Sequence, residues 1–485
     1  MKRQGHSHHS NHTYKNISSH VAGKLIALVQ LLLSVALIAV IWNSGLLPKK
    51  YMAAVIILLV LLFAVCFGLQ YIKNRAYIAG TVISIIISAG LAVGTFYMMQ
   101  ATQLMKDVGG ATYKTDNMVV VVKKDDSAEN LLAAKNYRFG VQTAVDQENN
   151  DKMVEDVQKV IGRDMKLEEY QTLQEEAEAL LKGRIDAAIY NEAFTGIIEE
   201  AIEDYSSEVK ILYQYGIDTP IEQEETSVEK PFNVYISGID VSGPITTNSR
   251  SDVNIIMTVN TNTKKILLTT TPRDYYLQIP GVSGEQKDKL THAGIYGVDV
   301  SMSTLERLYD IDISYYARVN FTSLISIVDA LGGIDVNSDY AFTTLHGKYE
   351  IQQGMNHMDG ATALGFSRER YSFEDGDNQR GKNQEAVLTA ILQKAMSPAV
   401  IRNANEIIAS VSESVETNMT QEEMARFISM QLANPSGWSI ESIAASGTGD
   451  MQSCFSSGAQ PLYVMQPGQA SVTEIKGKMK QVLEE

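Results

Sequence analysis

The chain has little cysteine and fewer basic than acidic residues, and each of these features excludes a class of protein. Its 485 residues include two cysteines, Cys66 in an apolar run and Cys454 near the C-terminus. A pair so placed is not expected to bridge, so no disulfide framework holds the fold. Lysine and arginine number 41 against 57 aspartates and glutamates, which gives a formal net charge of −16. Proteins that bind nucleic acid usually carry a basic footprint, so no direct nucleic-acid binding is expected.

Charge is also missing from three apolar runs near the N-terminus, at residues 25–42, 51–72 and 76–100. Each run is close to the ~20 apolar residues with which a helix crosses a hydrocarbon core. A cleaved signal peptide would instead show one shorter run and a small-residue cleavage site. We therefore predict a cytoplasmic tail at residues 1–24 and three transmembrane helices within residues 25–100.

Basic residues flank these runs unevenly. With the N-terminus inside the cell, six of them would face the cytoplasm: Lys2, Arg3, Lys15, Lys24, Lys73 and Arg75. Three others, Lys49, Lys50 and Lys106, would lie near the outer face. The positive-inside bias thus favours a cytoplasmic N-terminus, and three spans then place everything after residue 105 outside. Since little cysteine is also compatible with export by a Gram-positive cell, we expect a multi-pass protein of such a cell membrane with extracellular C-terminal domains.

Two domains are expected beyond the spans. Strands at 118–122, 137–142 and 187–190, with helices at 128–136 and 147–161, predict a small α/β accessory domain over residues 105–217. It shows no catalytic constellation, and its acidic runs, which include Glu175, Glu176, Glu178, Glu199, Glu200, Glu203 and Asp204, are interpreted as solvated helix faces. Residues 218–231 are acidic and bounded by Pro220 and Pro231, which is typical of a linker.

Residues 232–485 predict a second, catalytic domain. Strands are expected at 232–239, 253–259, 266–270 and 315–319, and helices at 323–330, 360–367 and 382–396. Strands that alternate with helices indicate an α/β (α+β) sandwich whose central mixed sheet is covered by helices.

Arginine is scarce, with fourteen in the chain, yet five lie in short polar signatures of this domain: Arg250, Arg273, Arg368, Arg370 and Arg380. A guanidinium offers a rigid fork of donors that matches phosphate oxygens. Arg380 and Gln384 are four residues apart and would share one helix face. Arg368 and Arg370 are two residues apart, so on a helix their side chains would point in different directions. Both side chains could reach one site only if the segment between them is irregular. The pattern predicts a site for a pyrophosphate and a divalent metal.

Aspartates lie beside these arginines. Asp240 ends one strand and Asp252 opens the next, so the two could share one Mg²⁺, which takes one or two carboxylates together with waters and phosphates. An equal alternative is that Asp240 caps a turn and that Asp252 caps locally or pairs with Arg250. Asp274 either orients the guanidinium of Arg273 within the site or forms a purely structural salt bridge with it.

The order of these motifs resembles the LytR–CpsA–Psr family. The motifs are Arg-Ser-Asp at 250–252, Thr-Pro-Arg-Asp at 271–274, Leu-Gly-Gly-Ile-Asp at 331–335, the segment 354–361, Ser-Arg-Glu-Arg at 367–370, and Asp377 followed by Arg-Gly-Lys-Asn-Gln at 380–384. The resemblance is strong over residues 232–395 and fainter to the end. Three spans and an accessory domain before the catalytic domain resemble the members encoded in streptococcal capsule loci.

The resemblance implies an enzyme, a glycopolymer–peptidoglycan phosphotransferase. Such an enzyme moves a capsular polysaccharide, as a glycan phosphate, from a polyprenyl-pyrophosphate carrier onto peptidoglycan with Mg²⁺, or alternatively Mn²⁺. The implied pyrophosphate contacts are Arg250, Arg273, Arg368, Arg370, Arg380 and Gln384. The implied metal ligands are Asp240 and Asp252, and the implied catalytic residues are Asp252, Arg273, Asp274 and Arg380. Many members carry a second arginine where this chain has Asn383, which puts a catalytic role at that position in doubt.

The carrier lipid would need an apolar tunnel. Candidates for its lining are Ile255, Ile256, Val259, Leu324, Ile325 and Val328, most of which fit an ordinary core equally well. Expected partners are the carrier-linked glycan, peptidoglycan, membrane lipids and other capsule-assembly membrane proteins. Three alternative functions stay open: a regulator of capsule expression, a non-catalytic module that binds the glycan or controls its chain length, and a hydrolase with water as acceptor. A DNA reader is disfavoured because the cytoplasmic part has no length for a helix-turn-helix.

Overall fold

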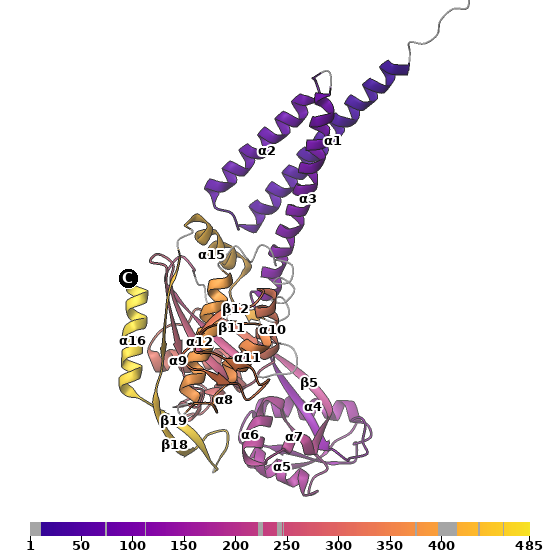
Figure 1. Cartoon of the computed structure of the whole chain (residues 1–485). Coiled ribbons are helices and arrows are strands. Elements are labelled where there is room, and N and C mark those ends of the chain that lie inside the picture. Colours follow the sequence, from indigo (N-terminus) through magenta and orange to yellow (C-terminus); the bar gives the residue numbers. More distant parts are fainter. Residues whose placement is uncertain are drawn as a thin grey trace, which may run out of the picture. The chain divides into compact units, whose positions relative to one another are not determined.

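The computed structural model of the chain describes residues 11–72, 75–111, 113–221, 227–239, 245, 247–373, 376–395, 415–434, 437–458 and 460–485 (Figure 1). Its contacts divide the chain into two compact units. One unit is Met1–Asp107 with Thr420–Ser436, and the other is Val108–Met419 with Gly437–Glu485. Both cysteines are free and buried, and they lie in different units, as expected for a chain without a disulfide framework.

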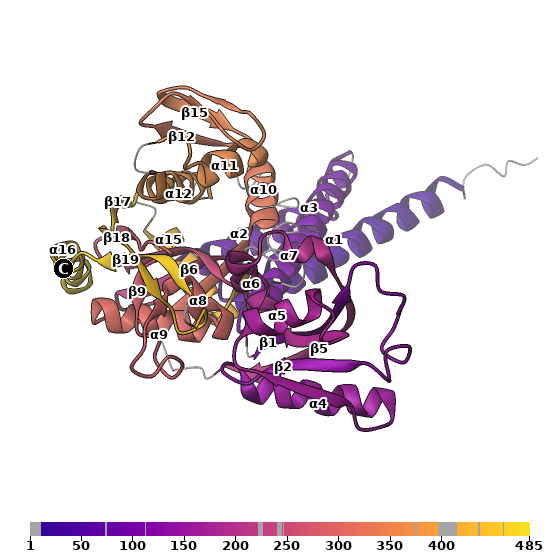
Figure 2. The same cartoon turned by 90° about the horizontal axis from the view of Figure 1, so that it is seen from below.

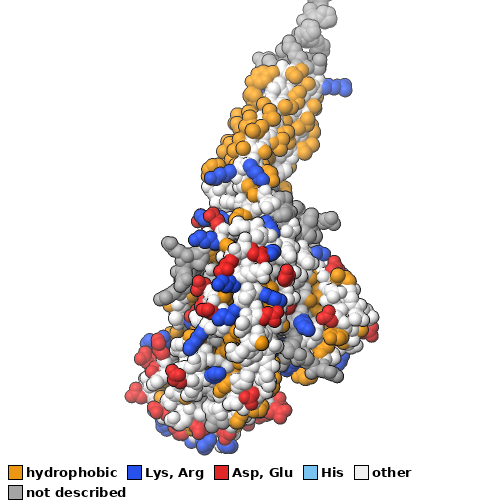
Figure 3. Space-filling view, turned by 90° about the vertical axis from the view of Figure 1, so that its left-hand side faces the viewer, with side chains coloured by type: hydrophobic (Ala, Val, Ile, Leu, Met, Phe, Trp, Pro, Cys, Tyr) orange, Lys and Arg blue, Asp and Glu red, His pale blue; other side chains and the backbone are white. Residues whose placement is uncertain are grey.

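The first unit is helical. Its helices are α1 (Asn11–Ser44), α2 (Lys49–Leu69), α3 (Ala76–Val108) and α15 (Gln421–Ala433). Among the described residues, three helices are long and apolar enough to cross a membrane: Val21–Ser44, Lys49–Leu69 and Ala76–Val108. The three spans expected from the sequence are thus confirmed as candidates. Their apolar side chains are largely exposed on the protein itself (Figure 3), which suits helices that face lipid.

A buried polar contact joins two of these helices. The hydroxyl of Ser84 in α3 donates a hydrogen bond of 2.7 Å to the side-chain oxygen of Gln30 in α1. Both side chains are fully buried. Because hydrocarbon offers no partner to an unpaired amide or hydroxyl, such a contact fixes which faces of α1 and α3 meet.

The second unit begins with the segment predicted as an accessory domain, and we keep that name for it. In the described part of the chain its sheet has five strands in the order β3-β2-β4-β1-β5. The strands are β1 (Tyr113–Lys123), β2 (Arg138–Gln142), β3 (Lys166–Tyr170), β4 (Ala187–Asn191) and β5 (Val209–Pro220). The helices are α4 (Gln147–Ile161), α5 (Leu173–Leu181), η1 (Glu192–Phe194), α6 (Thr195–Ala201) and α7 (Tyr205–Glu208). Strand β1 is apolar throughout its centre because both sheet faces are covered: Val119 and Val121 join one core cluster, and Val120 joins the other.

Two details of this domain differ from the sequence expectations. Residues 128–136, expected as a helix, form an irregular stretch at 128–130 and turns at 131–136. Asp126 and Asn130 are the reason, since their side chains accept hydrogen bonds from the backbone amides of Ala128 and Ala133 and so compete with helical bonding. Strand β5 runs to Pro220 and takes in the first residues of the segment expected as a linker, of which 222–226 lie outside the described residues.

Glu176, expected on a solvated helix face, is instead buried, with 1% of its surface exposed. Leu173, Glu176, Ala177 and Leu180 follow the spacing of one helix stripe, and that stripe packs on the sheet. The carboxyl oxygen of Glu176 accepts a 2.9 Å hydrogen bond from the amide of Ile189 in β4. Burial raises the pKa of Glu176 to about 8, and the two backbone hydrogen bonds that lower it are too weak to offset this.

The rest of the second unit is built on a mixed sheet in the order β16-β11-β6-β7-β8-β17, counted over the residues described. The strands are β6 (Phe232–Ile239), β7 (Ser251–Asn260), β8 (Lys265–Thr270), β11 (Tyr315–Asn320), β16 (Val415–Thr417) and β17 (Ser439–Ala444). Strand β6 is antiparallel to β7 and parallel to β11, and β8 is antiparallel to β7 and parallel to β17. The predicted mixed α+β fold is confirmed.

Helices cover both faces of this sheet (Figure 2). One face packs on α8 (Leu290–Tyr296), α9 (Val298–Tyr309) and α16 (Gln469–Glu484), and the other faces α10 (Phe321–Ala330), α11 (Gly360–Arg368) and α12 (Gly376–Ala395). Tyr235, Ile256 and Leu267 enter the core beneath α8, α9 and α16. Their neighbours Ile236 and Ile255 therefore point to the opposite face, as the two-residue period of a strand requires.

Four two-stranded sheets complete the described part of the unit. They pair β9 (Tyr276–Leu277) with β10 (Asp288–Lys289), β12 (Ile334–Ser338) with β15 (Gly354–Met358), β13 (Phe342–Thr343) with β14 (Glu350–Ile351), and β18 (Gly447–Ser453) with β19 (Pro461–Pro467). The first of them brings Lys289 to the edge of the site described below.

Replacing Glu176 by Gln is expected to flatten the pH dependence of stability. The pKa of Glu176 is about 8 in the folded chain against an ordinary 4.5, so the folded chain keeps a proton that the unfolded chain releases between these values. The wild type should therefore lose stability as the pH rises from about 5 to about 8, and Glu176→Gln should lose less. Thermal unfolding of the full chain in detergent, followed by circular dichroism at both pH values, measures the difference.

The matched control is Glu155→Gln, because Glu155 is an exposed glutamate of the same domain, on α4. This variant should keep the wild-type slope of unfolding temperature against pH. Equal slopes in wild type and Glu176→Gln would show that the carboxyl is already ionised in the folded chain.

Candidate functional site

A cavity of about 350 Å³ lies between the sheet face of Ile236 and Ile255 and the helices α10, α11 and α12. Its polar lining residues are Asp252, Arg273, Asn320, His346, Ser367, Arg368, Arg370, Tyr371, Arg380 and Gln384. Its other lining residues are Ile236, Gly238, Val253, Ile255, Val319, Leu324, Ile327, Val387, Leu388 and Ile391. The cavity thus combines several guanidinium groups with a largely hydrocarbon wall.

One stripe of α12 shows how this polarity is arranged. Arg380 and Gln384, four residues apart, both line the cavity, as their spacing predicts. Further along the same helix face come Val387, Leu388 and Ile391. A helix rises ~1.5 Å per residue, so the lining changes from charged to apolar over roughly 15 Å along α12.

Arg368 and Arg370 both reach the cavity because the backbone between them is not helical. Helix α11 ends at Arg368, and Glu369 takes an extended conformation with φ −68° and ψ 132°. The buried carboxylate of Glu369 accepts hydrogen bonds from the amides of Leu345 and Ser372, which ties down the turn. Burial opposes its ionisation, but these bonds hold the pKa of Glu369 below its usual value.

The central contact of the site joins Asp252 to Arg273. Asp252 lies near the start of β7, and Arg273 lies in the turn that follows β8, the strand paired with β7. One guanidinium nitrogen (Nη1) of Arg273 donates a 2.8 Å hydrogen bond to the Oδ1 oxygen of Asp252. Burial by itself would raise the pKa of Asp252, but the nearby charges of Arg273, Arg250 and Arg380 hold it below its usual value. Asp252 is therefore an anion at neutral pH.

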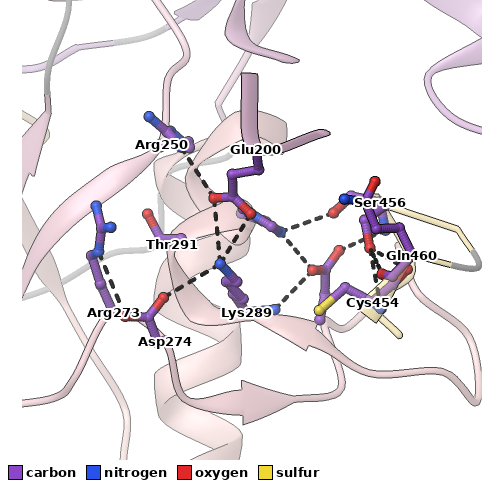
Figure 4. A network of polar contacts seen from close by, with 12 residues as sticks. Glu200, Arg250, Arg273, Asp274, Lys289, Thr291, Cys454, Ser456 and Gln460 are labelled. Carbon is purple, nitrogen blue, oxygen red and sulfur yellow. Dashed lines mark hydrogen bonds and ion pairs between the residues drawn. The ribbon is translucent and has the colours of Figure 1, made fainter. Parts of the chain in front are cut away.

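Two of the predicted residues lie beside this cavity and do not line it. Arg250 places Nη1 3.5 Å from Oε1 of Glu200 in the accessory domain (Figure 4). Asp274 places Oδ2 3.7 Å from Nε of Arg273 and Oδ1 3.6 Å from Nζ of Lys289. A smaller pocket beside the main one is lined by Asp274 together with Asp252, Arg273, Arg380 and Gln384. The position of Asp274 fits a role in holding Arg273.

The metal site stays a prediction. Asp240, the second expected ligand, lies outside the described residues. Across the part of the chain that is described, no group of three or more His, Cys, Asp or Glu side chains could hold a metal ion. Asp252 offers one anionic carboxylate at the cavity wall. That suits a Mg²⁺ whose remaining ligands are waters and substrate phosphates, and it does not suit an all-protein cage.

The tunnel candidates divide in a similar way. Ile255 and Leu324 line the cavity, whereas Ile256 and Val328 belong to core clusters. Val259 is buried, and neither it nor Ile325 is among the lining residues.

Some lining residues were not predicted from the sequence. The stripe of α12 after Gln384 was missed, although its helical spacing is visible in the sequence. His346, Asn320 and Tyr371 were missed because no motif marks them. Asn383 turns towards α11, where its amide donates to the carbonyl of Phe366 at 3.1 Å.

The chain resembles known proteins over this domain. A polyisoprenyl-teichoic acid–peptidoglycan teichoic acid transferase, TagU, of Bacillus cereus is 33% identical over 204 residues, which are 42% of this chain and 65% of that protein, just under two thirds of its length. TagU of Enterococcus faecalis is 32% identical over 263 residues, 54% of this chain and 84% of that protein.

Among solved structures, TagV of Bacillus subtilis is 24% identical with a TM-score of 0.45, covering 53% of this chain and 98% of that one. TagT bound to LI-WTA is 28% identical with a TM-score of 0.43, covering 54% of this chain and 94% of that one. The model of the LytR_cpsA_psr family matches residues 200–481, which is more than half of the sequence and contains every residue of the cavity. The chain belongs to the LytR_cpsA_psr family.

Proposed function

We propose that this chain is a membrane-anchored phosphotransferase that moves a phosphate-linked glycan from a polyprenyl-pyrophosphate carrier onto peptidoglycan. One observation carries the proposal: four arginines, Arg273, Arg368, Arg370 and Arg380, line the same cavity as a stripe of aliphatic side chains. A pyrophosphate with a polyprenyl tail needs that combination of cationic and apolar walls. The names of the relatives, which describe transfer of a polyisoprenyl-linked polymer to peptidoglycan, support the same reaction.

The cargo proposed here is a capsular polysaccharide, on the strength of the three spans and accessory domain that resemble capsule-locus members. The cavity would lie outside the cell. Within the described residues, Lys24 and Arg75 flank the spans on the side proposed as cytoplasmic. This orientation puts the arginines where both the carrier's glycan and peptidoglycan are accessible.

The reaction breaks one phosphorus–oxygen bond and forms another. A hydroxyl oxygen of the peptidoglycan acceptor attacks the sugar-linked phosphorus, and its proton passes to an aspartate of the site. The bridging oxygen departs with the polyprenyl phosphate. Negative charge builds on the transferring group and on the leaving phosphate. The arginines stabilise that charge, and they do so more strongly beside a hydrocarbon wall than in water.

The two aspartates suit different parts of this reaction. Asp252 lines the cavity and is held ionised, so it can accept the hydroxyl proton of the acceptor or hold a Mg²⁺ that contacts the phosphate. Asp274 is buried and lies near two cations, Arg273 and Lys289, which suits positioning of Arg273 better than accepting the hydroxyl proton. Mg²⁺, or Mn²⁺ in its place, would be held by Asp252 and Asp240 and would neutralise phosphate charge when bound.

Removing one cavity arginine is expected to abolish most transfer. Arg273→Ala and Arg380→Ala should each lower the rate by at least about 100-fold, the usual loss when one donor to a developing negative charge is removed. The assay mixes the full chain in detergent with a polyprenyl-pyrophosphoryl glycan, a peptidoglycan oligomer and Mg²⁺, and follows the joined product by mass spectrometry. Thermal unfolding establishes that each variant folds.

Arg307→Ala is the matched control, because Arg307 is an exposed arginine on α9 and does not line the cavity. It should retain wild-type transfer. Undiminished transfer in both cavity variants would remove this site from the reaction. Release of free glycan phosphate in place of the joined product would instead identify a hydrolase, and carrier binding without turnover would identify a non-catalytic module.

Replacing Asp252 is expected to remove the dependence on metal. Chelation should stop transfer by the wild type, and Mg²⁺ or Mn²⁺ should restore it. Asp252→Asn should lose roughly 100-fold or more in rate and gain nothing from added metal, because a neutral amide is a poor Mg²⁺ ligand and leaves Arg273 without its anion. Wild-type transfer in the presence of a chelator would indicate that the arginines act without a metal.

A further inference from the structure

A row of alternating charges runs from the accessory domain into the cavity (Figure 4). It begins at Glu200, the penultimate residue of α6. Its carboxylate oxygens lie 3.3 and 3.1 Å from Nζ of Lys289 in β10. The same Nζ lies 3.6 Å from Asp274, whose other oxygen lies 3.7 Å from Nε of Arg273. Arg273 ends the row in the cavity, bonded to Asp252.

The distances rank the partners of Lys289. Its contact with Glu200 lies within hydrogen-bond range, whereas its contact with Asp274 is longer than a hydrogen bond. Glu200 therefore holds the ammonium group back from Asp274. Without that hold, the ammonium would close on Asp274 and compete with Arg273 for its carboxylate.

Burial strengthens the competition between Lys289 and Arg273 for the carboxylate of Asp274. The side chains of Lys289 and Asp274 are 7% and 9% exposed, so water screens their charges little. Three cations, Arg250, Arg273 and Lys289, meet three carboxylates, those of Glu200, Asp274 and Asp252. Glu200 is the one of the three carboxylates that the accessory domain contributes. Removing it would leave an excess positive charge beside a buried ammonium, which is costly.

We propose that Glu200 is a positioning residue supplied by the accessory domain, which fixes Lys289 and, through Asp274, sets the orientation of Arg273 in the cavity. The inference rests on the proposed function, in that Arg273 contacts the carrier pyrophosphate. It adds a residue of the accessory domain to the carrier-binding machinery. Arg250, which contacts the same carboxylate, is held at the same junction.

The test measures carrier binding apart from transfer. Isothermal titration calorimetry of the full chain in detergent, with geranylgeranyl pyrophosphate and Mg²⁺, gives the Kd. Arg273→Ala should weaken binding by about tenfold or more, and Glu200→Gln, which keeps size but loses charge, by about fivefold. Because Glu200 acts through Arg273, the double variant should bind no more weakly than Arg273→Ala alone.

Asp299→Asn is the matched control. Asp299 pairs with Lys114 at 2.8 Å, a second ion pair between the accessory and catalytic domains, and it lies outside the charge row. This variant should bind like the wild type. Lys289→Gln removes the ion pair between Lys289 and Glu200 by changing the cation, and it should also weaken carrier binding. If Glu200→Gln does not fold, Lys289→Gln replaces it in the test.

Four outcomes are decisive. Three of them would overturn the positioning role while leaving the proposed function intact. They are a wild-type Kd in Glu200→Gln, a double variant whose loss of affinity is the product of the two single losses, and a loss of affinity in Asp299→Asn equal to that in Glu200→Gln. The last of these would assign the effect to domain docking. A wild type that binds no polyprenyl pyrophosphate would overturn the proposed function itself, and the inference with it.

Discussion

The ion pair of Asp252 and Arg273 is the contact on which the rest of the site depends. It joins the start of β7 to the turn that follows β8, just beyond the paired region of the two strands. A partly buried carboxylate is stable as an anion only when it is paired, and a guanidinium in the same place needs a partner to hold its direction. Each residue thus satisfies the other, and the pair sets the polar wall of the cavity before any ligand arrives. Preorganisation of this kind is the main source of catalysis by charge stabilisation.

The sheet and α12 extend this polar wall into an apolar one. Residues alternate across the sheet, so Tyr235 and Ile256 fill the core while Ile236 and Ile255 face the cavity. On α12 the same face carries Arg380 near its start and Ile391 farther on. The low-dielectric wall strengthens the electrostatic effect of the nearby arginines. A cavity with this gradient favours a ligand that is anionic at one end and hydrocarbon at the other.

Local patterns predicted most of the fold, and longer-range contacts account for what they missed. Strand β6 and helix α4 have the predicted bounds because two-residue and helical periods are directly visible in sequence. The burial of Glu176 follows from which stripe of α5 packs on the sheet, and an acidic run does not reveal that stripe. The joint approach of Arg368 and Arg370 depends on one extended residue between them. The position of the Arg250 side chain is set by its ion pair with Glu200, which lies fifty residues earlier in the chain, and no spacing rule predicts that contact.

Glu200 gives the accessory domain a thermodynamic connection to the cavity. The charge row is neutral only when the carboxylate from α6 is in place, so the arrangement of Lys289 and Arg273 depends on how that helix sits. Such dependence is reciprocal: whatever shifts α6 changes the affinity of the cavity for a pyrophosphate, and an occupied cavity changes the equilibrium position of α6 by the same factor. A domain with no catalytic constellation of its own can in this way control when Arg273 is ready to receive the carrier. The connection is short, because α6 is linked to Asp274 through a single side chain, that of Lys289, which hydrogen-bonds to Glu200 and lies 3.6 Å from Asp274.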